Sequence, residues 1–496
     1  MSGDNSYQPV HSDRELGMDR KISRRDLLDG MAVTVGAAAT GGLLSGCAAG
    51  EWGGIHDKVV NPPDGWDQAG RGSPGHPPAM TGLRGSTNPA MRIPHELRDG
   101  VFWAGEKPVH RTGEHYDLVV VGAGISRLSA AYFYRRKHPN ATVLILDNHD
   151  DFGGHARRNE FTVNGRLIVG YGGSQSIEAP SVWSKEARGL LDELGIDHFP
   201  DGNNGVCRLL VGRLIPGTGA PRAMGGETSA RIDYSRLDVA GDAVRLRLNT
   251  PCVRVHHTGG NPGAKTVEVD FHRDGKVHRC TAGGVVMACC NTMIPYLMQD
   301  LPTSRREALF YGTKLPIVYA MVLLRDWRAW RRLGIYHTRF TSGDWVVAEL
   351  DYPVSMGGYR FSHDPGQPVL VHMIRMATAP AYRNPRGGIG PGRRELFGRP
   401  YERYERSIRD QLTRLLKGGG FDPARDIPGI TVNRWGHGYA LEYGRPWADF
   451  WPDGPLPSVR GRRPFGRVTI ADSDSQNRAY ADAAIDAAWR AVEELG

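Results

Sequence analysis

Residues 116–158 constrain the fold of this chain more than any other segment. Within them, an apolar run at 118–121 leads into the glycine-containing turn 122–124, and a second apolar run at 143–146 ends on Asp147. This order predicts a βαβ unit, in which small residues let the backbone approach a pyrophosphate and the following helix donates N–H groups to it. Asp147 comes 25 residues after the first glycine, close to the spacing at which a carboxylate reaches ribose hydroxyls.

The unit departs from the usual nucleotide-binding pattern at one position. Its first two glycines are Gly122 and Gly124, but the third glycine position holds Arg127. That glycine normally lets the helix and the strand pack closely, so Arg127 is expected to alter either this packing or the affinity for the cofactor. A plain βαβ unit is the alternative interpretation, since GxG turns occur in many loops. The Asp-Phe-Gly-Gly run at 151–154 favours a flavin, because it resembles the paired-glycine turn of the amine oxidase and phytoene desaturase group.

Size, charge and cysteine spacing exclude several classes of protein. A chain of 496 residues is long enough for two or three domains. Its 62 Lys and Arg against 54 Asp and Glu give a net charge of +8, spread without a polybasic block, and we expect no nucleic-acid partner. The six cysteines form neither a CxxC nor a CxxCH pattern, so we expect neither zinc nor covalently bound c-type haem. So few cysteines in a large chain also exclude a disulfide scaffold.

The first 47 residues are predicted to be an export signal. Arg24 and Arg25 precede an uncharged run at 31–46, which is too short to span a membrane and is typical of a twin-arginine signal. We therefore expect the twin-arginine export machinery as a partner and a periplasmic or cell-envelope location. A tail with a chance arginine pair is the alternative. The run 44–47 resembles a lipobox, which makes Cys47 a candidate lipid anchor, with simple cleavage nearby as the competing interpretation.

Two further segments carry candidate site residues. The apolar run 315–324 predicts a central strand with Lys314 at its start. Burial is expected to depress the pKa of Lys314, and a strand-end lysine that reaches solvent is the alternative. Near the C-terminus, a strand at 467–471 precedes Asp472 and a helix at 479–495, so a second helix N-terminus could face an anionic cofactor. An ordinary terminal αβ unit is the alternative there.

Other side chains suggest a site for a cation. The aromatic residues Trp435 and Tyr439 could belong to the core, or could bind a cationic amine by cation–π attraction. Glu178 and Asp351 are candidate anchors for a distant ammonium group, although most such carboxylates lie at the surface. His437 has no partner at metal-ligand spacing and is expected to be structural.

Taken in order, many stretches of the chain resemble the bacterial spermidine dehydrogenase family, which consists of twin-arginine-exported flavoproteins of the amine oxidase superfamily. The resemblance runs from about residue 77 to the C-terminus. The matching stretches are 77–86, 95–100, 145–161, 172–178, 311–319, 351–362, 419–440 and 465–474.

The resemblance implies an α/β fold like that of the amine oxidases. In this fold an FAD-binding Rossmann-like domain of the glutathione-reductase type contains an inserted α+β substrate domain. Residues 384–393, rich in Gly, Arg and Pro, are expected to form a surface loop. The expected segments are the signal (1–47), a Gly/Pro-rich arm (48–112), the FAD-binding parts (113–178, 249–300 and 446–496) and the substrate-domain parts (179–248 and 301–445).

The resemblance also implies roles for individual residues. Lys314 matches the lysine that holds a water beside flavin N5 in amine oxidases, and Tyr439 and Tyr480 match the two rings that frame the substrate amine. Glu178 would hold a remote ammonium group. The residues expected to bind FAD are Gly122, Gly124, Ser126, Asp147, Asn148, Gly153, Gly154, His155, Gly173, Ser174, Val253, Asp472, Ser473 and Ala481.

The implied activity is FAD-dependent oxidation of an amine, such as the polyamine spermidine, by hydride transfer to flavin N5. Hydrolysis of the imine would then give an aldehyde and a shorter amine, and the electron acceptor is not identified by the sequence. Haem b is a second cofactor of the family. Family members often carry a histidine where this chain has Thr87, which leaves His95 as the candidate ligand, and no other metal is expected. The alternatives are a flavin-dependent desaturase or amino-acid oxidase, and a non-catalytic flavoprotein.

Overall fold

The computed structural model describes residues 11–16, 18, 75–196, 201–226, 228–379, 385–440, 442 and 456–496. The arginine pair and apolar run of the expected export signal, Cys47 and residues 48–74 of the Gly/Pro-rich arm lie outside the described residues. Of the helices in this described part, none is both long enough and apolar enough to cross a membrane.

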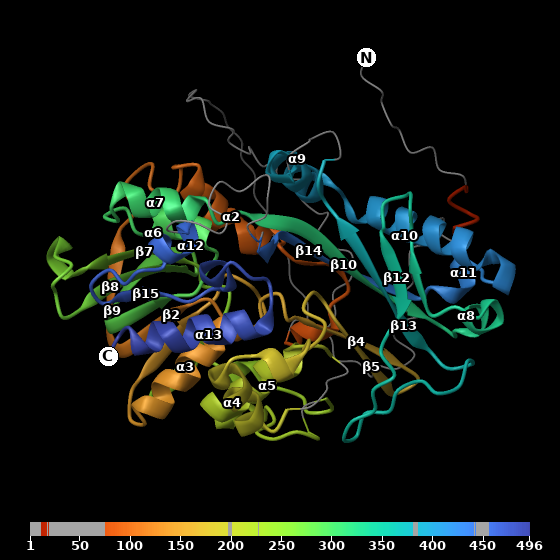
Figure 1. The fold of residues 1–496 in the computed structure, drawn as a ribbon, viewed down its shortest axis with the longest axis horizontal. Coiled ribbons are helices and arrows are strands. Elements are labelled where there is room, and N and C mark those ends of the chain that lie inside the picture. Colours follow the sequence, from red (N-terminus) through yellow and green to blue (C-terminus); the bar gives the residue numbers. More distant parts are fainter. Residues whose placement is uncertain are drawn as a thin grey trace, which may run out of the picture.

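A seven-stranded sheet, here called the Rossmann sheet, contains the predicted βαβ unit (Figure 1). Strand β2 (Val109–Val121) pairs in parallel with β3 (Val143–Leu146), and helix α3 (Ile125–Lys137) connects them, so this prediction is confirmed. On the other side of β2 lies β9 (Lys276–Met287), which pairs with β15 (Val468–Ile470). Segments from both ends of the chain therefore meet in one sheet. The remaining strands are β6 (Val244–Arg247), β7 (Cys252–His257) and β8 (Val267–Arg273).

Helices cover both faces of the Rossmann sheet. Successive side chains of β2 point to opposite faces, so Leu118 and Val120 belong to one core and Val119 and Val121 to the other. All four are nearly inaccessible to solvent, as expected for a parallel strand covered on both faces. The first core contains α3, α4 (Lys185–Leu194), α5 (Asn204–Leu214) and α13 (Ala481–Glu493), and the second contains α2 (Asn88–Arg98), α6 (Ile294–Leu297) and α7 (Thr303–Phe310).

A second, six-stranded sheet packs beside the first (Figure 1). Strand β10 (Lys314–Leu324) lies between β14 (Gly429–Ala440) and β13 (Val369–Met376), which confirms the predicted central strand. The hairpin of β4 (Arg158–Val163) and β5 (Arg166–Tyr171) covers one face. Helices α8 (Arg328–Leu333), α9 (Pro385–Gly398) and α10 (Tyr401–Leu416) cover the other face. The sheet is completed by β1 (Gly82–Gly85), β12 (Val347–Leu350) and β11 (His337–Arg339), and the short helices are α11 (Pro423–Asp426) and α12 (Pro457–Gly461).

Two segments differ from the expected organisation. Most of the segment expected to be a surface loop lies in helix α9, because Leu396 and Phe397 bury against the second sheet and this burial outweighs the glycines and Pro391. The segment 179–248, expected in the substrate domain, contributes α4, α5 and β6 to the Rossmann layer. Its apolar residues pack against α3 and α13. These elements of the segment therefore belong to the same layer as the nucleotide-binding part and not to a separate domain.

Arg158 ties the β4–β5 hairpin to the chain after residue 200. Its side chain is 1% exposed, and it lies 2.8 Å from Asp201 and 2.6 Å from Glu160. In Arg158→Met a buried carboxylate loses its partner, and we expect the free energy of unfolding to fall by roughly 3–5 kcal/mol. Urea denaturation followed by circular dichroism measures the loss. The control is Arg136→Ala, whose exposed pair with Glu193 should contribute about 0–1 kcal/mol, and equal losses in both variants would contradict the prediction.

Candidate active site

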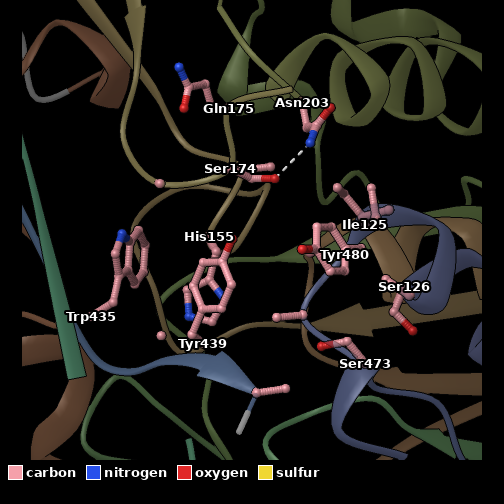
Figure 2. Close-up of a pocket in the computed structure, with 18 of the residues that line it drawn as sticks. Ile125, Ser126, His155, Ser174, Gln175, Asn203, Trp435, Tyr439, Ser473 and Tyr480 are labelled. Atoms are coloured by element: carbon pink, nitrogen blue, oxygen red, sulfur yellow. Dashed lines mark hydrogen bonds between the residues drawn. The ribbon is translucent and has the colours of Figure 1, made fainter. Parts of the chain in front are cut away.

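A cavity lies where the segments that follow β2 and β15 meet the second sheet (Figure 2). It encloses about 990 Å³, part of which is open to solvent. Ligands of open α/β sheets bind at the carboxyl ends of the strands, which is where this cavity lies. Its walls come from the start of α3, the segments that precede β4 and follow β5, strands β10 and β14, and the segment around the start of α13.

Lys314 begins β10 and is buried in the wall of the cavity. Its side chain is 3% exposed, and its Nζ lies 3.0 Å from Asp472 Oδ1 and 3.1 Å from Asp474 Oδ1. Burial alone would lower the pKa of Lys314, but the charges of these two carboxylates outweigh burial and raise the pKa above its ordinary value. The expected depressed pKa is therefore wrong, and so is the alternative of a lysine that reaches solvent. Lys314 is a fixed positive charge at the cavity.

Asp472 and Asp474, at the start of the short helix η9 (Ser473–Gln476), differ in their electrostatic surroundings. Burial acts to raise the pKa of both carboxyl groups. At Asp472 the charges of Lys314 and Arg127 overcome burial and lower the pKa to about 2. At Asp474 burial and the neighbouring charge of Asp472 outweigh Lys314, and they raise the pKa to about 6. The pair therefore contains one carboxylate that stays ionised and one that titrates in mildly acidic solution.

Aromatic rings form another wall of the cavity. Trp435 is 2% exposed, and its ring meets the edge of His155 with the centroids 4.7 Å apart. Burial and nearby cations lower the pKa of His155 to about 3, so its ring is neutral. Tyr439 and Tyr480 are 39% and 40% exposed. Both rings line the cavity (Figure 2), and burial together with the neighbouring Tyr480 raises the pKa of Tyr439.

Polar side chains on and beside the segment that follows β5 line the cavity. Asn203 donates to Ser174 Oγ over 2.7 Å, as Figure 2 shows, and Gln175 donates to Glu349 Oε1 over 3.0 Å. Glu178 is exposed at the rim. These groups can form hydrogen bonds to a bound molecule, and Glu178 adds a negative charge at the entrance.

Arg127 occupies the nucleotide-binding turn. Its Nη1 lies 2.8 Å from the position that a Cβ of Gly124 would take, and its Nε lies 2.6 Å from the corresponding position at Gly122. The second glycine of such a turn lacks a side chain so that its backbone can approach the pyrophosphate. In this chain the guanidinium group fills that space, and its Nη2 pairs with Asp472 Oδ2 at 2.7 Å.

The residues predicted to bind the adenosine part of the cofactor already make contacts within the protein. The predicted ribose ligand Asp147 accepts a hydrogen bond of 2.5 Å from the Ala123 N–H, and bonds of 2.8 and 2.9 Å from the backbone N–H and the ring of His149. Asn148 donates to the Ala90 carbonyl at 2.8 Å, and the side chain of Val253 is buried in the core of the Rossmann sheet. The carboxylate expected to bind the ribose is therefore satisfied within the protein.

The structure brings most of the sequence-predicted site residues to the cavity, and their individual roles stay predictions. Asp351 is buried outside the cavity lining, with its pKa raised well above the ordinary value by burial. The predicted residues that line the cavity are Gly124, Ser126, Gly153, His155, Gly173, Ser174, Glu178, Lys314, Tyr439, Asp472, Ser473, Tyr480 and Ala481. Those outside its lining are Gly122, Asp147, Asn148, Gly154, Val253 and His95.

The sequence analysis missed Asp474 as a partner of Lys314. A signal for it was present, because two acidic residues spaced by one follow the strand β15, and a buried lysine requires negative charge nearby. It also missed Asn203, which lies on a segment assigned to another domain.

The haem expectation gains no support from the described residues. His95 lies in α2, packs edge-on against Phe397 with the centroids 5.2 Å apart, and has its pKa lowered to about 4 by burial. Within the described ranges, no group of three or more His, Cys, Asp or Glu side chains could hold a metal ion.

One part of the site suits the flavin ring of FAD and the other part does not suit the dinucleotide. The residue types of the inner part suit a flavin ring, since a cavity with an aromatic wall and glycine-containing segments adjoins the buried cation Lys314. The outer part does not fit a dinucleotide as the chain stands, because Arg127 fills the pyrophosphate position and Asp147 is already satisfied.

Comparisons with known proteins define the class of fold. The model of the NAD(P)-binding Rossmann-like domain family matches residues 120–194, and with the sheet topology it confirms the expected α/β fold with a Rossmann-like domain. No sequence among the curated proteins matches the chain.

Solved structures with low similarity include two amine oxidases. Putrescine oxidase bound to putrescine is 14% identical, with a TM-score of 0.46 over 77% of this chain and 99% of that chain. Cyclohexylamine oxidase from Brevibacterium oxydans is 14% identical, with a TM-score of 0.41 over 77% of this chain and 98% of that chain. Likenesses at this level assign neither a substrate nor a cofactor.

Asp474 should make the stability of the protein depend on pH. Its pKa is raised from 3.8 in the unfolded chain to about 6, so the folded state binds this proton more tightly. The resulting stabilisation is present at acidic pH and is lost as the pH rises through about 6. Asp474→Asn stays neutral, so the Tm difference between variant and wild type should shift in favour of the variant from about pH 4 to about pH 8. Thermal unfolding across this range measures the difference, and a constant difference would contradict the prediction.

Proposed function

We propose that the chain is a flavin-dependent oxidoreductase that oxidises an amine. The observation that carries the proposal is the convergence of Lys314, Trp435 and the two accessible tyrosines Tyr439 and Tyr480 on one cavity at the carboxyl ends of the Rossmann strands. FAD is the form of flavin that the Rossmann unit suggests. The resemblance of the sequence to spermidine dehydrogenases suggests a polyamine such as spermidine as the substrate.

Substrate recognition rests on the accessible part of the cavity. Tyr439 and Tyr480 present aromatic surface there, and aromatic faces attract ammonium groups by cation–π interaction. Glu178 at the rim supplies a carboxylate for a second, remote ammonium group of the same substrate. The buried cation Lys314 disfavours an ammonium deeper in the cavity, so the reacting nitrogen has to arrive there neutral.

The chemistry divides between the flavin and the protein. A bound flavin supplies the acceptor for the hydride that leaves the carbon beside the amine nitrogen, and water then hydrolyses the imine to an aldehyde and a shorter amine. Lys314, held by two carboxylates, keeps a positive charge at the inner wall. Because the pKa of His155 is lowered to about 3, its ring is too weak a base to take the proton of an ammonium group, and Asp474 is engaged with Lys314. The substrate is therefore deprotonated in solution before it binds.

Arg127 favours a second candidate function. Because its guanidinium group fills the pyrophosphate position, a flavoprotein without turnover, or a chain that holds no flavin, is the competing interpretation. A colourless purified protein that binds no added flavin would support this second candidate.

Substrate oxidation is tested by anaerobic mixing of the flavin-loaded protein with spermidine, putrescine and an apolar polyene. We expect the amines to bleach the visible absorbance of the flavin and the polyene to leave it unchanged. In Tyr439→Leu the bleaching rate should fall by about tenfold or more, because one cation–π contact is lost. The control is Tyr336→Leu, since Tyr336 is 75% exposed and does not line the cavity. Bleaching by the polyene alone would point to a desaturase.

The rate should depend on pH through the substrate. Because only the neutral amine reacts, the bleaching rate at a fixed, low amine concentration should rise steadily from about pH 6 to about pH 9, towards the pKa of an alkylammonium. Stopped-flow absorbance across this range measures the profile. A flat profile would argue against a requirement for the neutral amine.

A further inference from the structure

The cavity ends at Arg127, and the shape of that end restricts the kind of nucleotide it can hold. Arg127 is the third residue of α3. Its side chain folds back over the preceding turn and occupies the space that side chains at Gly122 and Gly124 would take. Arg127 itself lines the cavity, whereas Gly122 and Asp147 on its far side do not. The path from the aromatic wall towards the adenosine part of a dinucleotide is therefore interrupted by a cation.

On the far side of Arg127, the residue expected to bind a ribose is Asp147, which already accepts hydrogen bonds from the protein. Both oxygens of Asp147 accept hydrogen bonds from the protein, at 2.5 Å from the Ala123 N–H and at 2.8 Å from the His149 N–H. A pyrophosphate at this turn would have to displace Arg127 from Asp472. That step leaves a buried carboxylate without one of its partners, and such losses are costly.

The near side of Arg127 can bind an anion. Arg127 lines the cavity, and its guanidinium group has further N–H donors besides the Nη2 that pairs with Asp472. The N-terminus of the 13-residue helix α3 lies at the same place, and helix N-termini attract phosphate groups. Asp472 also pairs with Lys314, so its negative charge is shared between two cations and repels an incoming anion less.

A phosphate monoester suits this arrangement better than a pyrophosphate diester. A terminal phosphate carries close to two negative charges at neutral pH and offers three oxygens to the planar guanidinium group, while it needs no room beyond Arg127. Asp472 connects the two cations, since its carboxylate contacts Lys314 on one oxygen and Arg127 on the other. Arg127, Lys314 and the aromatic residue Trp435 all line the same cavity, so a ring and a phosphate could be held in one site.

We propose that this site takes its flavin as the mononucleotide, with the terminal phosphate bound by Arg127, and that Arg127 selects against the dinucleotide. The inference rests on the proposed function in so far as the ligand is a flavin. It adds that one side chain, at the position where a glycine is usual, decides which flavin nucleotide is held.

The test is a binding measurement that does not depend on turnover. The full chain is purified, any flavin released on denaturation is identified by chromatography, and the flavin-free protein is titrated with riboflavin, FMN and FAD by fluorescence quenching. We expect FMN to be bound at least about tenfold more tightly than riboflavin or FAD, because only FMN gains the arginine–phosphate bond without displacing Arg127.

The variant Arg127→Gly separates the two nucleotides. It should weaken FMN binding by about tenfold or more and strengthen FAD binding, so that the preference reverses. Arg136→Ala on the exposed side of the same helix is the matched control and should leave the order of affinities unchanged. Should Arg127→Gly fail to fold, the comparison of the three flavins on the wild-type protein decides alone.

The outcomes distinguish this inference from the proposed function. Tighter binding of FAD than of FMN to the wild-type chain overturns the mononucleotide inference and leaves the amine oxidation proposal standing. Equal binding of riboflavin and FMN also overturns it, since Arg127 would then contribute nothing. If the chain binds none of the three flavins, both proposals fail.

Discussion

The carboxylate of Asp472 is the interaction on which the site depends. One of its oxygens lies 2.7 Å from Arg127 and the other lies 3.0 Å from Lys314. The first helix of the Rossmann unit, the first residue of β10 and the C-terminal segment therefore meet at one buried anion. Charges in a low-dielectric interior persist only when they are paired, so each of the three residues requires the others. The two sheets are held in register at the cavity by electrostatics as well as by apolar packing.

The elements with local signals were predictable from the sequence. The βαβ unit follows from two apolar runs separated by a helix and a glycine-containing turn, and the central strand β10 follows from an apolar run that begins after Lys314. Most other cavity residues were predicted through the resemblance to the amine oxidases, and only those that follow the first strand of the βαβ unit were predicted from strand geometry. Where a residue comes shortly after a strand end, as Asp472 comes two residues after the end of β15, its place was set by the strand.

The directions of long charged side chains were not predictable in the same way. Apolar neighbours in the sequence suggested a lysine with a depressed pKa, but Lys314 meets two carboxylates that come from 158 and 160 residues further along the chain, and these reverse the shift. Helix α9 formed against a composition typical of loops because Leu396 and Phe397 bury in the second sheet. In both cases a long-range contact outweighs the local preference, and a single sequence does not contain that contact.

The two ends of the cavity differ in how far they depart from the usual arrangement of a nucleotide-binding fold. The N-terminus of α3 carries the positive end of the helix dipole, so a cation at Arg127 is unfavourable there by up to about 1 kcal/mol unless an anion compensates it. Asp472 provides that anion and at the same time neutralises part of the charge of Lys314. Because one carboxylate serves both cations, the chain can place an arginine where the fold normally receives a pyrophosphate without disturbing the wall that would face a flavin ring. The part of the site that would hold the nucleotide and the part that would hold the flavin ring can therefore change independently. The arginine at residue 127 is expected to affect the choice of cofactor more than the reaction that is catalysed.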